Sequence, residues 1–201
     1  MVADISNSEY LPFLLDGNID INQGAANKGG TTIIRPWHNR KPVMPGTFLI
    51  YRDCKEVGNM KRRLRVYKKT AGICMDVVKN FTGVKPILGI CLGHQCIGEV
   101  LGGTVSYAKA LFHGKQSVIE YDGTSIFTGI DSPIKVARYH SLAVQQEDLP
   151  ECLKVLARTR DSEIMAIRHK EYPVVGLQFH PESIYTEHGK RIIENFVNGT
   201  M

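Results

Sequence analysis

From residue 71 onward, apolar and polar positions follow patterns that predict helices and strands in turn. Residues 73–81 place apolar side chains at helical spacing and end close to a glycine. Residues 86–90 form a short, fully apolar run of the kind that is buried in a parallel sheet. Residues 92–101 predict a second helix, which ends at Gly102 and Gly103.

Short apolar runs separated by turn signals such as Asp122-Gly123 dominate the chain after residue 103. A closing helix is expected at 191–197. Strand–helix alternation followed by short strands implies an α/β fold. We expect a three-layer domain with a central mixed, mostly parallel sheet flanked by helices, plus a small antiparallel strand region. The expected strands are residues 117–121, 134–138, 153–157, 164–169 and 174–179.

Residues 1–70 follow no comparable pattern. Two runs in this part, 11–15 and 48–51, have strand character, and Gly/Asn-rich and Pro-rich sequence lies between them. The whole chain has 201 residues and 43% hydrophobic content, which is enough to bury one substantial core. We therefore expect a single domain over 1–201.

The formal charge of +5 is local, because six basic residues lie within 61–69 and the rest of the chain carries −1 once these six are removed. A nucleic-acid binder usually spreads basic residues over a face and interleaves aromatic side chains. The basic segment is therefore interpreted as a solvated surface, and no nucleic-acid partner is expected.

The chain contains no apolar run of about 18 residues, so no membrane partner is expected either. The first ten residues do not resemble a secretory signal. The five cysteines show no disulfide-framework spacing, which favours a reducing compartment. The expected location is the cytoplasm, or an organelle stroma if a transit peptide has been removed.

Cys91 lies at the centre of a Gly-x-Cys-x-Gly turn, Gly89 to Gly93, between an apolar strand and a helix. In that context the nucleophile occupies a strained turn, and the glycines let neighbouring backbone pass without a clash. The helix N-terminus favours the thiolate, and the Leu92 N–H can donate to an oxyanion. Two other interpretations, a small buried hydrophobe and a metal pair with His94, fit the turn less well.

A thiol nucleophile needs a base, and the base needs a group that orients it. The best candidates are His180 and Glu182, which flank Pro181 after a strand-like run. Proline favours an extended conformation for the residue before it, and positions i and i+2 of an extended chain project to the same side. His180 and Glu182 can therefore both face Cys91. Of the other histidines, His140 follows a strand and could reach the site.

Five segments form recognisable motifs: PILGICLGHQCIGEVLGG, FHGKQS, ARYHSLAV, SEIMAIRHKEYPVVGLQFHPESI and TEHG. Together these motifs resemble the triad-type (class I) glutamine amidotransferases. The most similar members are the glutaminase subunit (component II) of anthranilate synthase and that of aminodeoxychorismate synthase. The resemblance covers residues 71–201, whereas 1–70 match the family poorly.

The resemblance implies that Cys91 attacks the side-chain amide of glutamine and that His180, supported by Glu182, moves the protons. A glutamyl thioester would form and be hydrolysed, and the ammonia would pass to a chorismate-utilising synthase subunit. No cofactor and no metal are expected. By the same resemblance, the residues that hold the substrate are Leu92, Gln95, Ser141 and Leu142.

The sequence departs from the family in its first 70 residues. The family carries a Pro-Gly-Pro-Gly loop with a second oxyanion donor, and the stretch before Ala71 reads LRVYKKT instead. We expect Leu92 to be the only oxyanion donor, rather than a replacement N–H from residues 54–70. Divergence, impaired catalysis or a corrupted N-terminal reading would each explain the departure. Two alternative functions therefore stay open: a catalytically impaired regulatory or binding subunit, and a stand-alone thiol hydrolase of another γ-glutamyl or peptide substrate.

Overall fold

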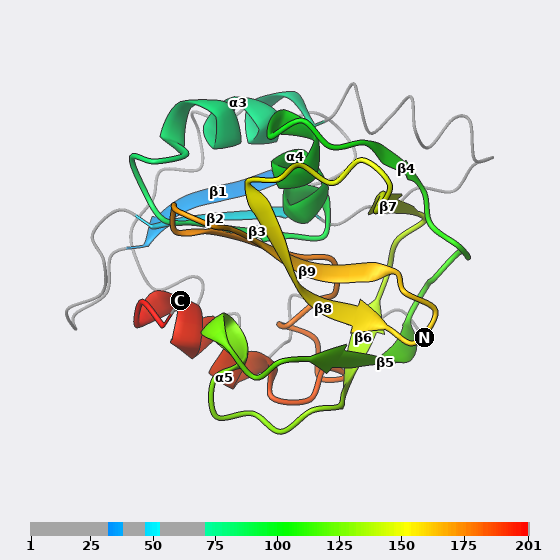
Figure 1. The fold of residues 1–201 in the computed structure, drawn as a ribbon. Coiled ribbons are helices and arrows are strands. Elements are labelled where there is room, and N and C mark those ends of the chain that lie inside the picture. The colour runs from blue at the N-terminus through cyan, green and yellow to red at the C-terminus, as the bar shows by residue number, and fades with distance from the viewer. Residues whose placement is uncertain (1–31, 38–46, 53–70, 201) are drawn as a thin grey trace.

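The computed structural model describes residues 32–37, 47–52 and 71–200. Its centre is an eight-stranded sheet in the order β1-β2-β3-β10-β9-β8-β5-β6 (Figure 1). A second sheet pairs β4 (Val105–Tyr107) with β7 (Leu142–Val144) in antiparallel fashion. The strands of the large sheet are β1 (Thr32–Trp37), β2 (Thr47–Arg52), β3 (Ile87–Ile90), β5 (Lys115–Tyr121), β6 (Ile134–Arg138), β8 (Leu153–Thr159), β9 (Ile164–His169) and β10 (Val174–Leu177).

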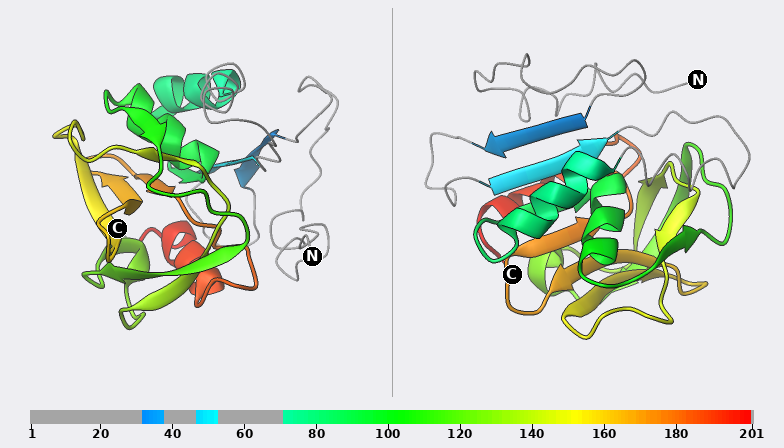
Figure 2. Two further views of the ribbon diagram at one scale, coloured as in Figure 1. Left: turned by 90° about the vertical axis from the view of Figure 1, so that its right-hand side faces the viewer. Right: turned by 90° about the horizontal axis from the view of Figure 1, so that it is seen from above.

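Helices lie on both faces of the large sheet, which gives the three expected layers (Figures 1 and 2). The helices α3 (Gly72–Phe81) and α4 (Leu92–Val100) cover one face, and α5 (Gly189–Val197) lies on the other. A short 3-10 helix, η3 (Ser125–Phe127), packs beside α5. None of the described helices is long or apolar enough to cross a membrane.

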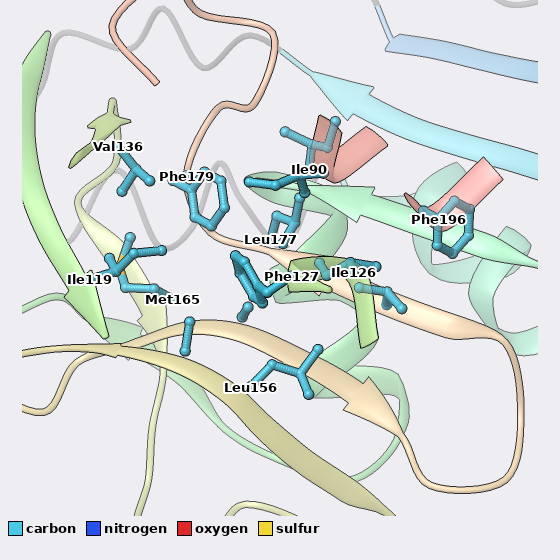
Figure 3. Close-up of a cluster of buried hydrophobic side chains, with 14 of the residues drawn as sticks. Ile90, Ile119, Ile126, Phe127, Val136, Leu156, Met165, Leu177, Phe179 and Phe196 are labelled. Carbon is cyan, nitrogen blue, oxygen red and sulfur yellow. The ribbon is translucent and has the colours of Figure 1, made fainter. Parts of the chain in front are cut away.

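Side chains on the two faces of β3 pack into two separate hydrophobic cores. Ile87 packs under α3 and α4, whereas Leu88 and Ile90 belong to the core on the α5 side, because successive side chains of a strand point to opposite faces. Figure 3 shows Ile90 and Leu177 in this second core. With both faces covered, all four residues of β3 are buried, as its apolar run predicts.

Helix α5 shows how the pattern of apolar residues selects a face. Ile192 and Phe196 lie four positions apart and are buried, while Lys190 and Arg191 stay exposed. The amide of Asn195, on the same buried side, donates to the carbonyls of Ile126 at 2.8 Å and Thr128 at 2.9 Å. These bonds tie α5 to the η3 segment.

The expected fold class is confirmed, but parallel pairing is rarer than expected. Among the described strands of the large sheet, only β2–β3 and β3–β10 pair in parallel. The neighbours β10–β9, β9–β8, β8–β5 and β5–β6 are antiparallel, as is β1–β2. The "mostly parallel" sheet is therefore corrected to a mixed sheet whose parallel part holds three strands around β3.

Most expected elements have their counterparts in the structure, with shifts of a few residues at their ends. The strand expected at 48–51 is β2, whereas the one at 11–15 lies outside the described residues. The sequence pattern did not reveal β1, β4, β7 or η3.

Candidate functional site

Cys91 occupies a strained turn between β3 and α4. Its backbone has φ 52° and ψ −97°, an unusual conformation for a residue with a side chain. The Cys91 N–H donates to the Leu177 carbonyl at 2.7 Å, so the turn is held to the end of the neighbouring strand β10. Cys91 is also the N-cap of α4, which places its sulfur at the positive end of the helix dipole.

Close contact between β3 and α4 explains why glycine precedes the turn. A Cβ on Gly89 would lie 2.5 Å from the carbonyl carbon of Gly93 and 2.6 Å from its oxygen. Such distances are far shorter than normal carbon contacts of about 3.5–4.0 Å. Glycine at position 89 thus lets strand and helix approach, as the first glycine of the Gly-x-Cys-x-Gly pattern indicates.

His180 and Glu182 follow β10 at the same end of the sheet as Cys91. The His180 Nδ1 lies 2.6 Å from the Glu182 Oε1, and both side chains are buried. The His180 N–H donates to the Ala137 carbonyl at 3.1 Å, and its own carbonyl accepts from the Thr186 hydroxyl at 2.6 Å. These backbone bonds hold the imidazole in a fixed place.

The structure brings Cys91 and His180 together, although about 90 residues separate them in sequence. Burial alone would lower the pKa of His180, but the Glu182 carboxylate and the adjacent Cys91 sulfur raise this pKa well above its usual range. Because the Nδ1 of His180 is hydrogen-bonded to Glu182, the other ring nitrogen, Nε2, is the one that can exchange a proton with the thiol. Sulfur, imidazole and carboxylate therefore stand in the expected order.

The four residues expected to hold the substrate all lie within the described part of the chain. Leu92 follows Cys91 as the first residue of α4, where helix geometry leaves its N–H without an intrahelical acceptor. Gln95 is buried, and its amide donates to the Leu142 carbonyl at 3.0 Å. Ser141 is half-buried, and its carbonyl accepts from the Ala108 N–H at 3.0 Å. Residues 54–70, the alternative source of a second oxyanion donor, lie outside the described residues.

Two side chains that the sequence did not single out also contact the triad. The Gln178 amide nitrogen lies 3.7 Å from the Cys91 sulfur, and the Tyr139 ring packs edge-on against the His180 ring at 5.2 Å. Gln178 was detectable in principle, because Gln178, His180 and Glu182 follow the i, i+2 alternation of an extended chain.

His94 is fully buried between α4 and β10, beside the backbone of Gly176. Burial lowers the pKa of His94 to about 4, so the ring is neutral near pH 7. In the part of the chain that the structure describes, no group of three or more His, Cys, Asp or Glu side chains is placed to hold a metal ion. The geometry fits a packing role for His94.

Comparison with known proteins gives the family. Residues 64–199 match the family model described as "Glutamine amidotransferase class-I". The chain belongs to this family. The strained cysteine turn and the His180–Glu182 pair are therefore found in a class-I glutamine amidotransferase domain.

Two named relatives show which members of the family this chain resembles. The chain is 53% identical over 127 residues to the aminodeoxychorismate/anthranilate synthase component 2 of Bacillus subtilis, which is 63% of this chain and 66% of that protein. It is 53% identical over 128 residues to the bifunctional protein TrpGD of Thermotoga maritima, covering 64% of this chain and 22% of that one. The match thus spans less than two thirds of each of these relatives.

One solved structure supports the fold. A protein of Thermoplasma acidophilum, provisionally described as belonging to a GMP synthase, superposes with a TM-score of 0.56 at 28% identity. The superposition covers 69% of this chain and 66% of that one. The arrangement of sheet and helices is thus shared with a solved structure.

Proposed function

We propose that this amidotransferase domain hydrolyses glutamine to glutamate and ammonia through a thioester on Cys91. The observation that carries the proposal is the alignment of the Cys91 sulfur, the His180 imidazole and the Glu182 carboxylate at one end of the sheet. A thiolate beside an imidazolium is the activated form of a cysteine nucleophile. The raised pKa of His180 favours that ion pair.

The reaction begins with transfer of the thiol proton to His180, after which the sulfur attacks the carbon of the glutamine side-chain amide. The oxyanion of the tetrahedral intermediate accepts a hydrogen bond from the Leu92 N–H. His180 then returns its proton to the leaving nitrogen, and the C–N bond breaks to release ammonia and leave the thioester. Water, deprotonated by His180, attacks the thioester, and the thiol regains the proton as glutamate leaves. Glu182 stabilises each imidazolium stage.

We propose Leu92, Gln95, Ser141 and Leu142 as the residues that hold glutamine. Gln95 and Leu142 are joined by a hydrogen bond close to Cys91, so they can form one wall of the substrate site. Ser141 precedes Leu142 and is partly open to solvent. A site that supplies matched polar groups can select an amide substrate strongly, because an analogue without them leaves buried groups unpaired.

We propose a chorismate-utilising synthase subunit as the partner that receives the ammonia. This rests on the relatives, one of which carries aminodeoxychorismate and anthranilate synthase in its name. On this basis the product of the complex is anthranilate or aminodeoxychorismate. The expected setting is a single amidotransferase domain working in the cytoplasm, or in an organelle stroma after removal of a transit peptide.

The test compares Cys91→Ala with the wild type in glutamine-dependent and ammonia-dependent synthesis by such a complex. Cys91→Ala should abolish glutamine hydrolysis, while synthesis from ammonium salts survives, because only the nitrogen source is lost. Cys152→Ala is the matched control, since Cys152 is a partly buried cysteine outside the site. Glutamine hydrolysis by the Cys91→Ala variant would eliminate Cys91 as the nucleophile. A wild-type chain that binds the synthase but never hydrolyses glutamine would instead indicate a regulatory role.

A further inference from the structure

A group of buried polar side chains, which the proposed reaction does not use, lies behind the substrate wall. The Arg138 guanidinium forms an ion pair with Glu163, and both side chains are almost wholly buried. Glu163 also accepts from the Lys109 N–H at 3.1 Å. The Arg138 Nε–H donates to the Nε2 of His140 at 3.0 Å.

This last bond fixes the protonation of His140. Because Nε2 accepts a hydrogen bond from Arg138, the ring proton must sit on Nδ1, which donates to the Leu142 carbonyl at 2.9 Å. Burial and the Arg138 charge hold the pKa of His140 well below its usual range, so the ring keeps this neutral form. His140 therefore connects the ion pair to Leu142 in one fixed direction.

Leu142 and two glutamines continue the connection to the nucleophile. The Leu142 carbonyl accepts a second bond from the Gln95 amide, which also donates to the Gln178 Oε1 at 3.2 Å. With its oxygen facing Gln95, Gln178 must turn its N–H group toward the Cys91 sulfur, 3.7 Å away. All side chains along this path are buried.

We propose that this hydrogen-bonded chain, from the Arg138–Glu163 pair through His140, Leu142 and Gln95 to Gln178, positions the Cys91 thiol. Gln178 touches the reacting sulfur and donates to it, whereas Arg138, His140 and Glu163 are positioning residues that act through their neighbours. The proposal rests on the proposed function and deepens it, because the same hydrogen-bonded chain would hold both the thiol and one wall of the glutamine site in place.

The energetics of buried ion pairs favour positioning over simple stabilisation. A buried ion pair often adds little net stability, and apolar residues of similar size can replace it without loss. Apolar residues cannot fix the direction of a carbonyl or an amide. The Gln95 amide nitrogen donates to both the Leu142 carbonyl and the Gln178 oxygen, so the N–H group of Gln178 is left to face the sulfur. The ion pair and His140 contribute by holding the Leu142 carbonyl in place.

The first experiment measures the rate at which iodoacetamide alkylates Cys91, with peptide mass spectrometry to separate Cys91 from the other cysteines. Gln178→Glu keeps an oxygen toward Gln95 but replaces the N–H that faces the sulfur by a second acceptor. Alkylation should slow by about tenfold or more, the effect of losing one hydrogen bond to a charged group. Gln178→Met, of similar size, should slow it as well. Alkylation of folded Gln178→Glu at the wild-type rate would overturn the proposal.

The second experiment tests His140, which lies in the part of the hydrogen-bonded chain that is remote from Cys91. His140→Leu should slow Cys91 alkylation and raise the KM for glutamine, whereas His140→Gln, whose amide can both accept and donate, should recover part of each loss. Asn195→Leu is the matched control, because it removes two hydrogen bonds between α5 and the η3 segment, neither of which involves Arg138, His140 or Gln178. It should lower the melting temperature without changing alkylation.

Two results separate this proposal from the proposed function. If His140→Leu behaves like Asn195→Leu and changes only stability, the chain does not position the thiol, whatever the glutaminase activity. A wild-type protein that does not hydrolyse glutamine would refute the proposed function, and the alkylation rates would still decide whether Gln178 and His140 position Cys91.

Discussion

Replacing Gly89 by alanine should place a methyl group where α4 leaves no room. The new Cβ would lie 2.5 Å from the Gly93 carbonyl carbon and 2.7 Å from the Ile97 Cδ1. Normal carbon contacts need about 3.5–4.0 Å, so strand and helix must separate by roughly 1 Å. Ile97 can rotate away, but the Gly93 backbone cannot. The shift therefore falls on the turn that holds Cys91.

We expect this displacement to reduce kcat/KM for glutamine by about 10²-fold, the usual effect of a misplacement of about 1 Å at a reacting group. Overpacking should also cost about 1–3 kcal/mol of unfolding free energy. Steady-state glutamine hydrolysis and urea unfolding measure the two effects. Gly103→Ala is the control, since its Cβ would meet atoms no closer than 3.1 Å at the far end of α4. A folded Gly89→Ala protein with kcat/KM within twofold of the wild type would refute the reasoning.

The buried titratable groups and a second tight glycine give three further predictions. Burial lowers the pKa of His94 from 6.5 to about 4, so the unfolded state binds more protons between these values. Stability should therefore fall by up to about 3 kcal/mol as pH drops from about 6.5 to about 4, and the fall should be smaller in His94→Gln when urea unfolding is repeated at each pH. The pKa of His180 is raised in the folded state, so its contribution to stability is present below pH 6.5 and is lost as pH rises through the folded pKa. Glu182→Gln should lower the His180 midpoint in an NMR titration and reduce kcat for glutamine; an unchanged midpoint would contradict the assignment. Gly189→Ala would put a Cβ 1.9 Å from the carbonyl oxygen of Pro181, which lies between His180 and Glu182. Glutaminase activity should therefore be lost even in soluble protein whose circular dichroism spectrum shows that it is folded. Full activity would disprove the close contact.

The centre of the site was predictable because its signals are local. The glycines around Cys91 record a steric requirement within five residues, and the spacing of His180 and Glu182 records the geometry of an extended chain. Both segments adopt the conformations that these patterns indicate. Their chemical roles remain predictions that the variants above test.

Strand direction was predicted less well, although the connection lengths held the information. Only residues 170–173 join β9 to β10, and only 160–163 join β8 to β9. Links this short make hairpins, because a parallel neighbour requires a crossover of a dozen or more residues. The apolar runs themselves carry no direction, and they were interpreted as mostly parallel.

The buried Arg138–Glu163 pair had no local signal at all. The two residues lie 25 positions apart on different strands or turns, and charged residues are rarely expected in a core. The strands β4 and β7 escaped detection for a different reason. Each has three residues, which is too short for an alternating pattern to stand out.

The parallel pairing of β3 with β10 has a consequence for the order in which the protein is made. These strands align Ile87 with Val174, so more than 80 residues must be synthesised between them. A nascent chain that has emerged only through β9 carries Cys91 but neither the partner strand β10 nor His180. Non-local contacts of this kind form late, because the loop must close before the contacts stabilise it. During translation, Cys91 therefore cannot pair with its base, His180, until the last strand of the sheet has been made.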